Sequence, residues 1–137
     1  MTARSISLLL VDDVPELREL IRYGMEEDPR FEVVGEAGDG RSALEGVSRA
    51  RPAAILLDLS MPDMDGLQAI LEIRRRDPRV AIVVLSGFAA DRLAAAALER
   101  GADDYVEKGT PIAELRDVTH RAVARRREMH HAARGAG

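Results

Sequence analysis

The sequence predicts an α/β protein, a doubly wound parallel sheet of five strands flanked by five helices. Two observations predict this class. Short aliphatic runs alternate with amphipathic segments along the 137 residues, which is the pattern of repeated βα units joined by right-handed crossovers. No internal repeat or low-complexity linker interrupts the alternation, so we expect one domain, long enough to build its own core.

The predicted strands are aliphatic runs without polar alternation. Runs of this length, rich in branched side chains, indicate strands that are buried on both faces of a parallel sheet. The fifth run is the weakest, because it holds only Tyr105 and Val106. The runs cover residues 6–11, 31–37, 53–57, 81–85 and 105–106.

The segments between the runs carry helix start and stop signals. In the first, Asp13 is the expected N-cap, Pro15 lies in the first turn and Pro29 follows the end. Gly101 suits the left-handed position after the fourth helix, and Thr110 is the expected N-cap of the fifth. The predicted helices occupy residues 13–28, 39–51, 66–78, 90–101 and 110–131.

Polar residues collect directly after the predicted strands, where ligands bind in open α/β sheets. If the strand order is 2-1-3-4-5, four strand ends bring them to one rim, whereas the end of the second strand offers less. Three carboxylates in a small space repel one another unless a cation neutralises them. An oxygen-only site of this kind suits Mg²⁺. The residues are Asp12 and Asp13 after the first run, Asp58 after the third, Ser86 after the fourth and Lys108 near the fifth.

Asp58 is the best candidate for a nucleophile. The sequence has no cysteine and no evident Ser–His arrangement. The covalent intermediate that its residue types allow is therefore an aspartyl phosphate. Asp58 ends the central run, and Asp12 and Asp13 would hold the metal. Lys108 offers a positive charge and Ser86 a hydroxyl donor, the groups that phosphoryl oxygens need.

Four segments carry the strongest family signal: LLLVDDVPELRELI, ILLDLSMPDMDGL, VVLSG and GADDYVEKG. Together, in this order and spacing, they resemble the CheY-like receiver domain of bacterial two-component response regulators, and the resemblance places that domain at residues 5–126. The resemblance implies a flavodoxin-like sheet of order 2-1-3-4-5 and Mg²⁺-dependent phosphoryl transfer to Asp58 from a sensor histidine kinase or a phosphotransfer protein. The implied site has Asp12, Asp13, Asp58 and the backbone carbonyl of Ser60 on the metal, Ser86 and Lys108 on the phosphoryl oxygens, Tyr105 as switch aromatic, and the small Gly87 leaving room for its movement.

Three residues depart from the family's common pattern or add to it. Gly109 follows Lys108 where many receivers have proline, so no cis peptide is assumed there. Ser86 replaces the more frequent threonine and keeps the hydroxyl. Phe88 is expected to limit water access and lengthen the phosphorylated lifetime.

Other acids and histidines are expected to have structural roles. Asp63 and Asp65 flank a turn before a predicted helix, which favours turn and cap roles over metal binding. His120 falls within the last predicted helix, where a surface or core position is expected. His130 and His131 are expected in the tail.

The charge distribution argues against direct nucleic-acid binding. Residues 1–111 hold 14 basic and 21 acidic residues, whereas residues 112–137 hold 6 basic and 3 acidic ones; a domain so acidic is an unlikely nucleic-acid binder. Residues 127–137 are expected to form a short basic tail, the frayed end of the last helix. No apolar run approaches the roughly 18 residues of a membrane helix.

The leading hypothesis is a stand-alone cytoplasmic receiver that catalyses only its own phosphorylation and dephosphorylation. It would act on a downstream protein through the face of the fourth helix, fifth strand and fifth helix, as a monomer or a phosphorylation-promoted homodimer, or would serve as a phosphate sink. One alternative is a receiver fragment of a DNA-binding transcriptional regulator. Another is a Mg²⁺-dependent aspartyl-phosphate phosphatase, which Ser60 disfavours because it stands where that chemistry needs a second acid. The intact acids, hydroxyl and lysine disfavour a vestigial interaction module.

Overall fold

The computed structural model describes residues 5–61, 65–87 and 91–136, and this part of the chain contains five strands and five helices. All strand pairs are parallel and their order is β2-β1-β3-β4-β5, which confirms the predicted fold class and strand order. The strands are β1 (Ile6–Val11), β2 (Phe31–Ala37), β3 (Ala54–Asp58), β4 (Ala81–Ser86) and β5 (Asp104–Glu107), and the helices are α1 (Pro15–Glu26), α2 (Gly40–Ala50), α3 (Gly66–Arg76), α4 (Asp91–Glu99) and α5 (Ile112–Ala136).

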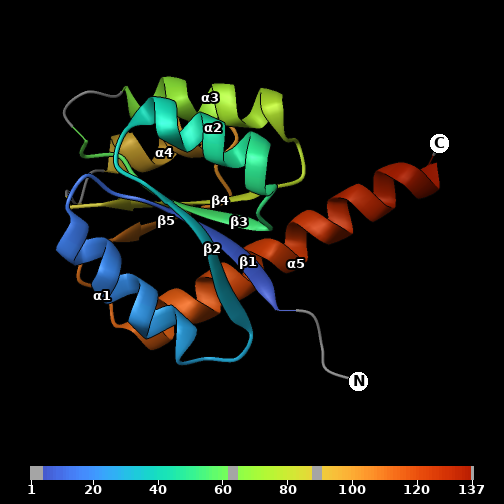
Figure 1. Ribbon diagram of the computed structural model, residues 1–137. Helices are drawn as coiled ribbons and strands as arrows, with labels where there is room; N and C mark the ends of the chain where they lie inside the picture. Colours follow the sequence, from blue (N-terminus) through green and yellow to red (C-terminus); the bar gives the residue numbers. More distant parts are fainter. Residues whose placement is uncertain (1–4, 62–64, 88–90, 137) are drawn as a thin grey trace.

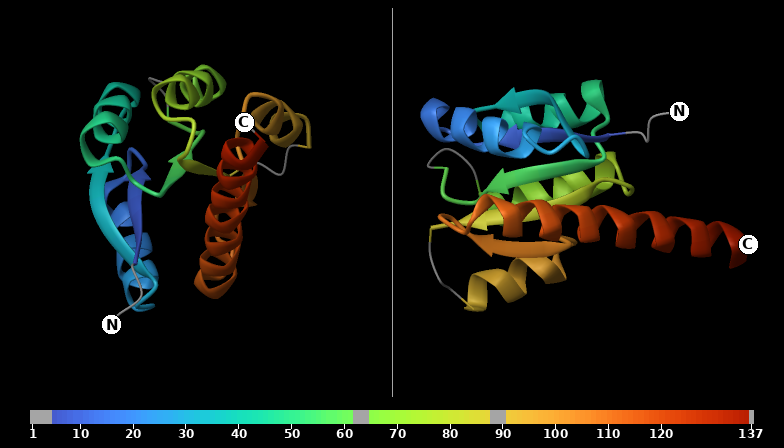
Figure 2. Two further views of the ribbon diagram at one scale, coloured as in Figure 1. Left: turned by 90° about the vertical axis from the view of Figure 1, so that its right-hand side faces the viewer. Right: turned by 90° about the horizontal axis from the view of Figure 1, so that it is seen from below.

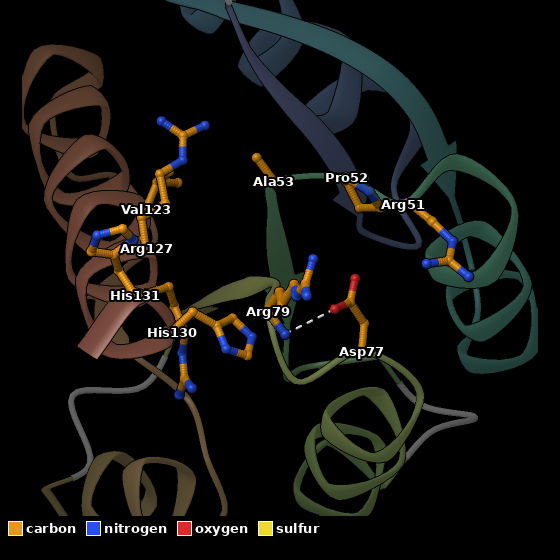
Figure 3. A pocket seen from close by; sticks show the side chains of 10 residues that line it. Arg51, Pro52, Ala53, Asp77, Arg79, Val123, Arg127, His130 and His131 are labelled. Atoms are coloured by element: carbon orange, nitrogen blue, oxygen red, sulfur yellow. Dashed lines mark hydrogen bonds between the residues drawn. The ribbon is translucent and has the colours of Figure 1, made fainter. Parts of the chain in front are cut away.

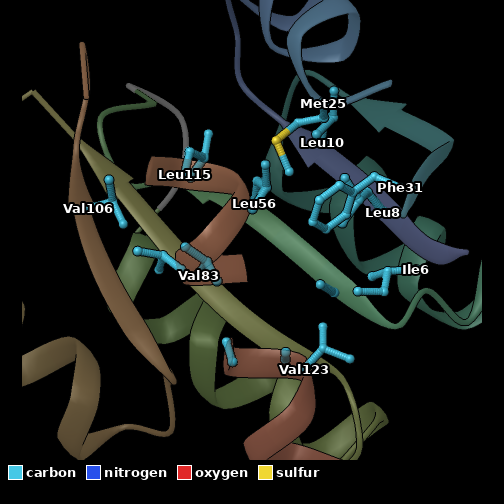
Figure 4. Close-up of a cluster of buried hydrophobic side chains, with 14 of the residues drawn as sticks. Ile6, Leu8, Leu10, Met25, Phe31, Leu56, Val83, Val106, Leu115 and Val123 are labelled. Atoms are coloured by element: carbon cyan, nitrogen blue, oxygen red, sulfur yellow. The ribbon is translucent and has the colours of Figure 1, made fainter. Parts of the chain in front are cut away.

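The helices cover the sheet in two layers, α1 and α5 on one face and α2, α3 and α4 on the other (Figures 1 and 2). Every residue of β3 and β4 is buried, because these interior strands have helices on both sides. Figure 4 shows the core beneath α1 and α5, where Leu8, Leu56 and Val83 of the strands pack with Met25 and Leu115 of the helices. Alternate strand side chains supply a second core beneath the other three helices.

The first helix corrects one sequence prediction. Val14, and not Asp13, is the N-cap residue of α1, and no side chain caps the helix. The Val14 amide donates instead to Oδ1 of Asp12 at 2.8 Å. The predicted capping role of Asp13 is therefore wrong, and its exposed carboxylate makes no cap.

The end of α4 confirms the predicted role of Gly101. Gly101 has a φ of +115°, in the left-handed region that glycine enters without a steric penalty. Its amide donates to the Leu98 carbonyl and the Ala102 amide to the Ala97 carbonyl, which is the paired pattern of a Schellman motif.

Helix α5 is 25 residues long and continues to Ala136, so the segment predicted as a tail is helical almost throughout. Figures 1 and 2 show its C-terminal half projecting past the sheet. At its other end α5 approaches α1 so closely that a Cβ on Gly24 would lie 2.5 Å from Cγ1 of Ile112. Within the described residues no helix is both long enough and apolar enough to cross a membrane.

Candidate functional site

The carboxyl edge of the sheet brings the predicted acids together. Asp58 is the last residue of β3 and is completely buried, and Asp12 follows β1 with only 3% of its surface exposed. Asp13 is exposed beside them. One carboxylate oxygen from each of the three lies within 4.8 Å of the others. The prediction that these acids share one small space is confirmed.

Each buried carboxylate is oriented by its own chain. Oδ1 of Asp58 accepts a hydrogen bond from the Ser60 amide at 2.7 Å, and Oδ1 of Asp12 accepts one from the Val14 amide at 2.8 Å. The backbone of Asp12 is also fixed, because its amide donates to the Ala37 carbonyl of β2 at 3.0 Å. Both acids therefore present their second oxygen, Oδ2, in a defined direction.

Lys108 lies between these second oxygens. Its Nζ is 2.9 Å from Oδ2 of Asp58 and 3.5 Å from Oδ2 of Asp12. The lysine backbone is held by a 2.8 Å hydrogen bond from its amide to the Ser86 carbonyl. Burial by itself would lower the pKa of Lys108, but the carboxylates of Asp58 and Asp12 outweigh it and raise that pKa above its ordinary value. Lys108 is therefore a positive charge fixed beside Asp12, Asp13 and Asp58, which together form the acid cluster.

The acid cluster keeps a surplus of negative charge, because one lysine faces three carboxylates. Neither buried Oδ2 accepts a well-directed hydrogen bond from any described residue, although buried oxygens normally have such partners. Mg²⁺ prefers carboxylate oxygens and a few waters. The donor set at Asp12, Asp13 and Asp58 therefore fits a hard divalent cation.

Ser86 and Gly87 stand at the same edge of the sheet, and Tyr105 lies within β5 opposite Val84. Ser86 ends β4, is fully buried and pairs with Glu107 of β5. Tyr105 is half-buried on the core beneath α2, α3 and α4. A Cβ on Gly87 would touch no described atom. The switch roles of Tyr105 and Gly87, and the metal-binding role of the Ser60 carbonyl, stay predictions.

The turn acids divide into one that the structure describes and one that it does not. Oδ1 of Asp65 accepts hydrogen bonds from the Leu67 and Gln68 amides at 3.1 and 3.2 Å, which confirms it as the N-cap of α3. Asp63 and Phe88 lie outside the described residues.

The backbone after Lys108 has no cis peptide, because all peptide bonds in the described chain are trans. Gly109 has a φ of +91°, which the ring of a proline would forbid.

Sequence reasoning missed Arg18 of α1. Its Nη1 donates to the backbone carbonyl of Asp12 at 2.6 Å, and its Nε lies 3.1 Å from Oε1 of Glu36. Glu36, near the end of β2, thus orients Arg18, and Arg18 in turn fixes the backbone at Asp12. In the sequence, the signal for this contact was Glu36 at the end of the second predicted strand, an end that was expected to offer less to the site.

The chain belongs to the response regulator receiver domain family, whose model matches residues 8–120. Among its relatives, the chemotaxis protein CheY of Listeria monocytogenes is 34% identical over 103 residues, which is 75% of this chain and 86% of that protein. The class is therefore a CheY-like receiver domain of two-component signal transduction.

Larger proteins also match the chain. Protein-glutamate methylesterase/protein-glutamine glutaminase 3 of Paramagnetospirillum magneticum is 42% identical over 125 residues, covering 89% of this chain but only 35% of that protein. The chain thus spans about a third of this relative. The crystal structure of a LuxR-family two-component response regulator from Aurantimonas superposes with a TM-score of 0.83 at 31% identity, covering 88% of this chain and 86% of that one.

Proposed function

We propose that Asp58 accepts a phosphoryl group from a phosphohistidine of a sensor histidine kinase or a phosphotransfer protein. The observation that carries this proposal is the completely buried Asp58 carboxylate, with Oδ2 2.9 Å from Lys108 Nζ and two further acids beside it. A buried acid whose charge is only partly compensated is arranged for chemistry more than for stability.

Oδ2 of Asp58 is assigned as the nucleophile, because Oδ1 already accepts the Ser60 amide. A bond forms between Oδ2 and phosphorus while the phosphorus–nitrogen bond of the phosphohistidine breaks, and the departing imidazole keeps the electron pair and takes up a proton. Lys108 and the Ser86 hydroxyl would hold the equatorial phosphoryl oxygens. Mg²⁺, bound by Asp12, Asp13, Asp58 and the Ser60 carbonyl, would neutralise negative charge on the carboxylates and the phosphoryl group.

The phosphodonor would dock on α1. A groove of about 500 Å³ between α1 and α5 begins at Asp12 and Lys108 and is bordered by Leu17, Leu20 and Tyr23. Leu20 is 67% and Tyr23 65% exposed, and exposed apolar side chains in a row along a helix are suited to receive a partner helix. The groove therefore leads from an apolar contact surface to Asp12 and Lys108 at the acid cluster.

On the output side, we place a downstream protein on the face of α4, β5 and α5, next to Tyr105. The domain would act in the cytoplasm as a signalling unit, catalyse only its own phosphorylation and dephosphorylation, and exist as a monomer or a phosphorylation-promoted homodimer. A stand-alone receiver is the first candidate. The likeness to a LuxR-family regulator favours a second, the receiver unit of a DNA-binding regulator. The mass of the native protein, detected with an antibody against this chain, separates them.

Incubation with acetyl phosphate and Mg²⁺, followed by intact-mass spectrometry, tests the phosphoacceptor. The wild-type chain should gain one phosphoryl group, and Asp58→Asn should gain none. Asp65→Asn is the matched control, because Asp65 is an acid of the same edge that caps α3; it should be phosphorylated like the wild type.

Two results would contradict the proposal. The first is an adduct that persists in Asp58→Asn. The second is steady hydrolysis of phosphate esters without an adduct, which would instead favour an aspartyl-phosphate phosphatase.

A further inference from the structure

A cavity of about 540 Å³ lies at the amino edge of the sheet, the edge opposite to the acid cluster (Figure 3). One wall is the C-terminal half of α5, and the facing walls are the segments that lead into β3 and β4. The cavity lies within the size range of small-molecule sites. Its basic lining residues are Arg51, Arg79, Arg126, Arg127, His130 and His131.

Most of this positive charge is uncompensated. The guanidinium groups of Arg51, Arg79 and Arg127 are exposed, and none makes a hydrogen bond or ion pair with a described residue. Asp77 is the one acid among the described lining residues, and its Oδ1 accepts the Arg79 amide at 2.8 Å. The cavity is thus a positive site on a chain whose net charge is −4.

His130 adds a polar atom that points into the cavity. Its ring turns from α5 toward Arg79 in Figure 3. Nε2 of the ring is buried and has no hydrogen-bond partner among the described residues, which is uncommon for a buried nitrogen. A ligand atom in the cavity would supply that partner.

Arg51 occupies a backbone position that disfavours it. It ends α2 with a φ of +44°, and it is the one non-glycine residue with a positive φ in the described chain. Glycine or asparagine usually fills this position, because other side chains are strained there. Backbone strain of this kind concentrates at functional sites, and here it places an arginine on the cavity wall.

We propose that this cavity binds a small anion that carries several phosphate groups. Arginine forks bind phosphate oxygens in pairs, and the arginines here stand on three different segments around one hollow. Pro52 and Val123 provide an apolar wall for the rest of such a ligand. The excess of acids elsewhere on the chain disfavours an extended polyanion such as duplex DNA. Binding of such an anion does not require Asp58 to be the phosphoacceptor.

Isothermal titration calorimetry of the full chain in Mg²⁺-free buffer tests the site, with inorganic triphosphate, ATP and a short DNA duplex as probes. Triphosphate should bind once per chain. Arg79→Ala and Arg127→Ala should each weaken binding about tenfold, the loss of one charge-assisted contact. Arg121→Ala is the matched control, since Arg121 is exposed on the same helix and does not line the cavity; binding should be unchanged, as it should be in Asp58→Asn.

Three outcomes would overturn the site: no binding heat, equal weakening by Arg121→Ala, or tighter binding of duplex DNA than of triphosphate. Equal affinities for triphosphate and ATP would assign the recognition to the phosphates alone, and tighter ATP binding would add the nucleoside; both support the site. Circular dichroism of each variant verifies that the fold is retained.

Discussion

The two edges of the sheet hold charge clusters of opposite composition: three acids with one lysine at the carboxyl edge, and two arginines with one acid at the amino edge. At the carboxyl edge a single cation, Lys108, stands between Asp58 at 2.9 Å and Asp12 at 3.5 Å. This cluster is short of positive charge. The missing charge is what a divalent cation would supply.

At the amino edge a single acid, Asp103, stands between two cations. Its Oδ2 lies 3.1 Å from Arg74 and its Oδ1 2.7 Å from Arg126. Burial first, and then the charge of Arg126, lowers the pKa of Arg74. This second cluster has a surplus of positive charge and borders the basic cavity. An unequal number of positive and negative side chains at a sheet edge favours a ligand of the opposite sign there.

Removing the single acid of the amino-edge cluster should have the largest effect on the free energy of unfolding. Asp103→Ala leaves Arg74, which is only 17% exposed at its side chain, without its counter-ion, and removes the acceptor of the Ile82 amide. We expect a loss of about 3 kcal/mol in the free energy of unfolding, because a buried partner is left unpaired. Urea unfolding measures it.

The neighbouring acid is the control for that experiment. Oδ2 of Asp104 lies 3.5 Å from Nη2 of Arg125, with both side chains at least 36% exposed, and its Oδ1 accepts the Tyr105 amide at 2.8 Å. Asp104→Ala should therefore cost no more than about 1 kcal/mol. Equal losses from the two variants would show that the amino-edge cluster has no special role in stability.

Adding Mg²⁺, which would supply the positive charge that the carboxyl edge lacks, should have the next largest effect on the free energy of unfolding. Mg²⁺ at a hundred times its dissociation constant should raise the free energy of unfolding by about 2.7 kcal/mol, because it binds the folded chain alone. Asp13→Asn should reduce this gain without affecting the metal-free fold, since Asp13 is exposed. Thermal unfolding with and without MgCl₂ measures both. An equal gain from NaCl at matched ionic strength would contradict a specific site.

Removing a capping acid outside both clusters should have a small effect, similar to that of Asp104→Ala. Asp65→Ala removes the acceptor of the Leu67 and Gln68 amides and should lower the free energy of unfolding by about 1 kcal/mol. The Mg²⁺-linked gain should persist in this variant. If the gain disappeared, the metal site would extend to Asp65 and would not be limited to Asp12, Asp13 and Asp58.

The fold class and most of the candidate site could be predicted from the sequence, because they follow from the spacing and order of the aliphatic strand segments along the chain. Asp58, Ser86 and Lys108 were found because a parallel sheet places consecutive strand ends at one edge. The N-cap of α1 was missed, since composition cannot decide which of two adjacent acids, Asp12 or Asp13, reaches the Val14 amide.

Contacts that depend on how helices lie on the sheet were also beyond the sequence. Arg18 reaches the Asp12 carbonyl only because of the placement of α1 over β1 and β2. The basic cavity joins Arg51, Arg79 and Arg127, which are far apart in the chain. No local spacing predicts such a group, because it depends on the length and direction of α5.

Helix α5 runs from the lysine loop at the carboxyl edge of the sheet to the basic cavity at the amino edge. It begins shortly after Lys108 and packs on the sheet as far as Arg126, beyond which its described side chains make no hydrogen bond or ion pair with other described residues. Residues 127–136 rise about 15 Å along the helix axis. A tilt of the packed half would move His130 and His131 further than Val123, as in a lever arm. A small movement at the lysine loop would thus be enlarged at the opposite end of the molecule, where it would widen or narrow the basic cavity.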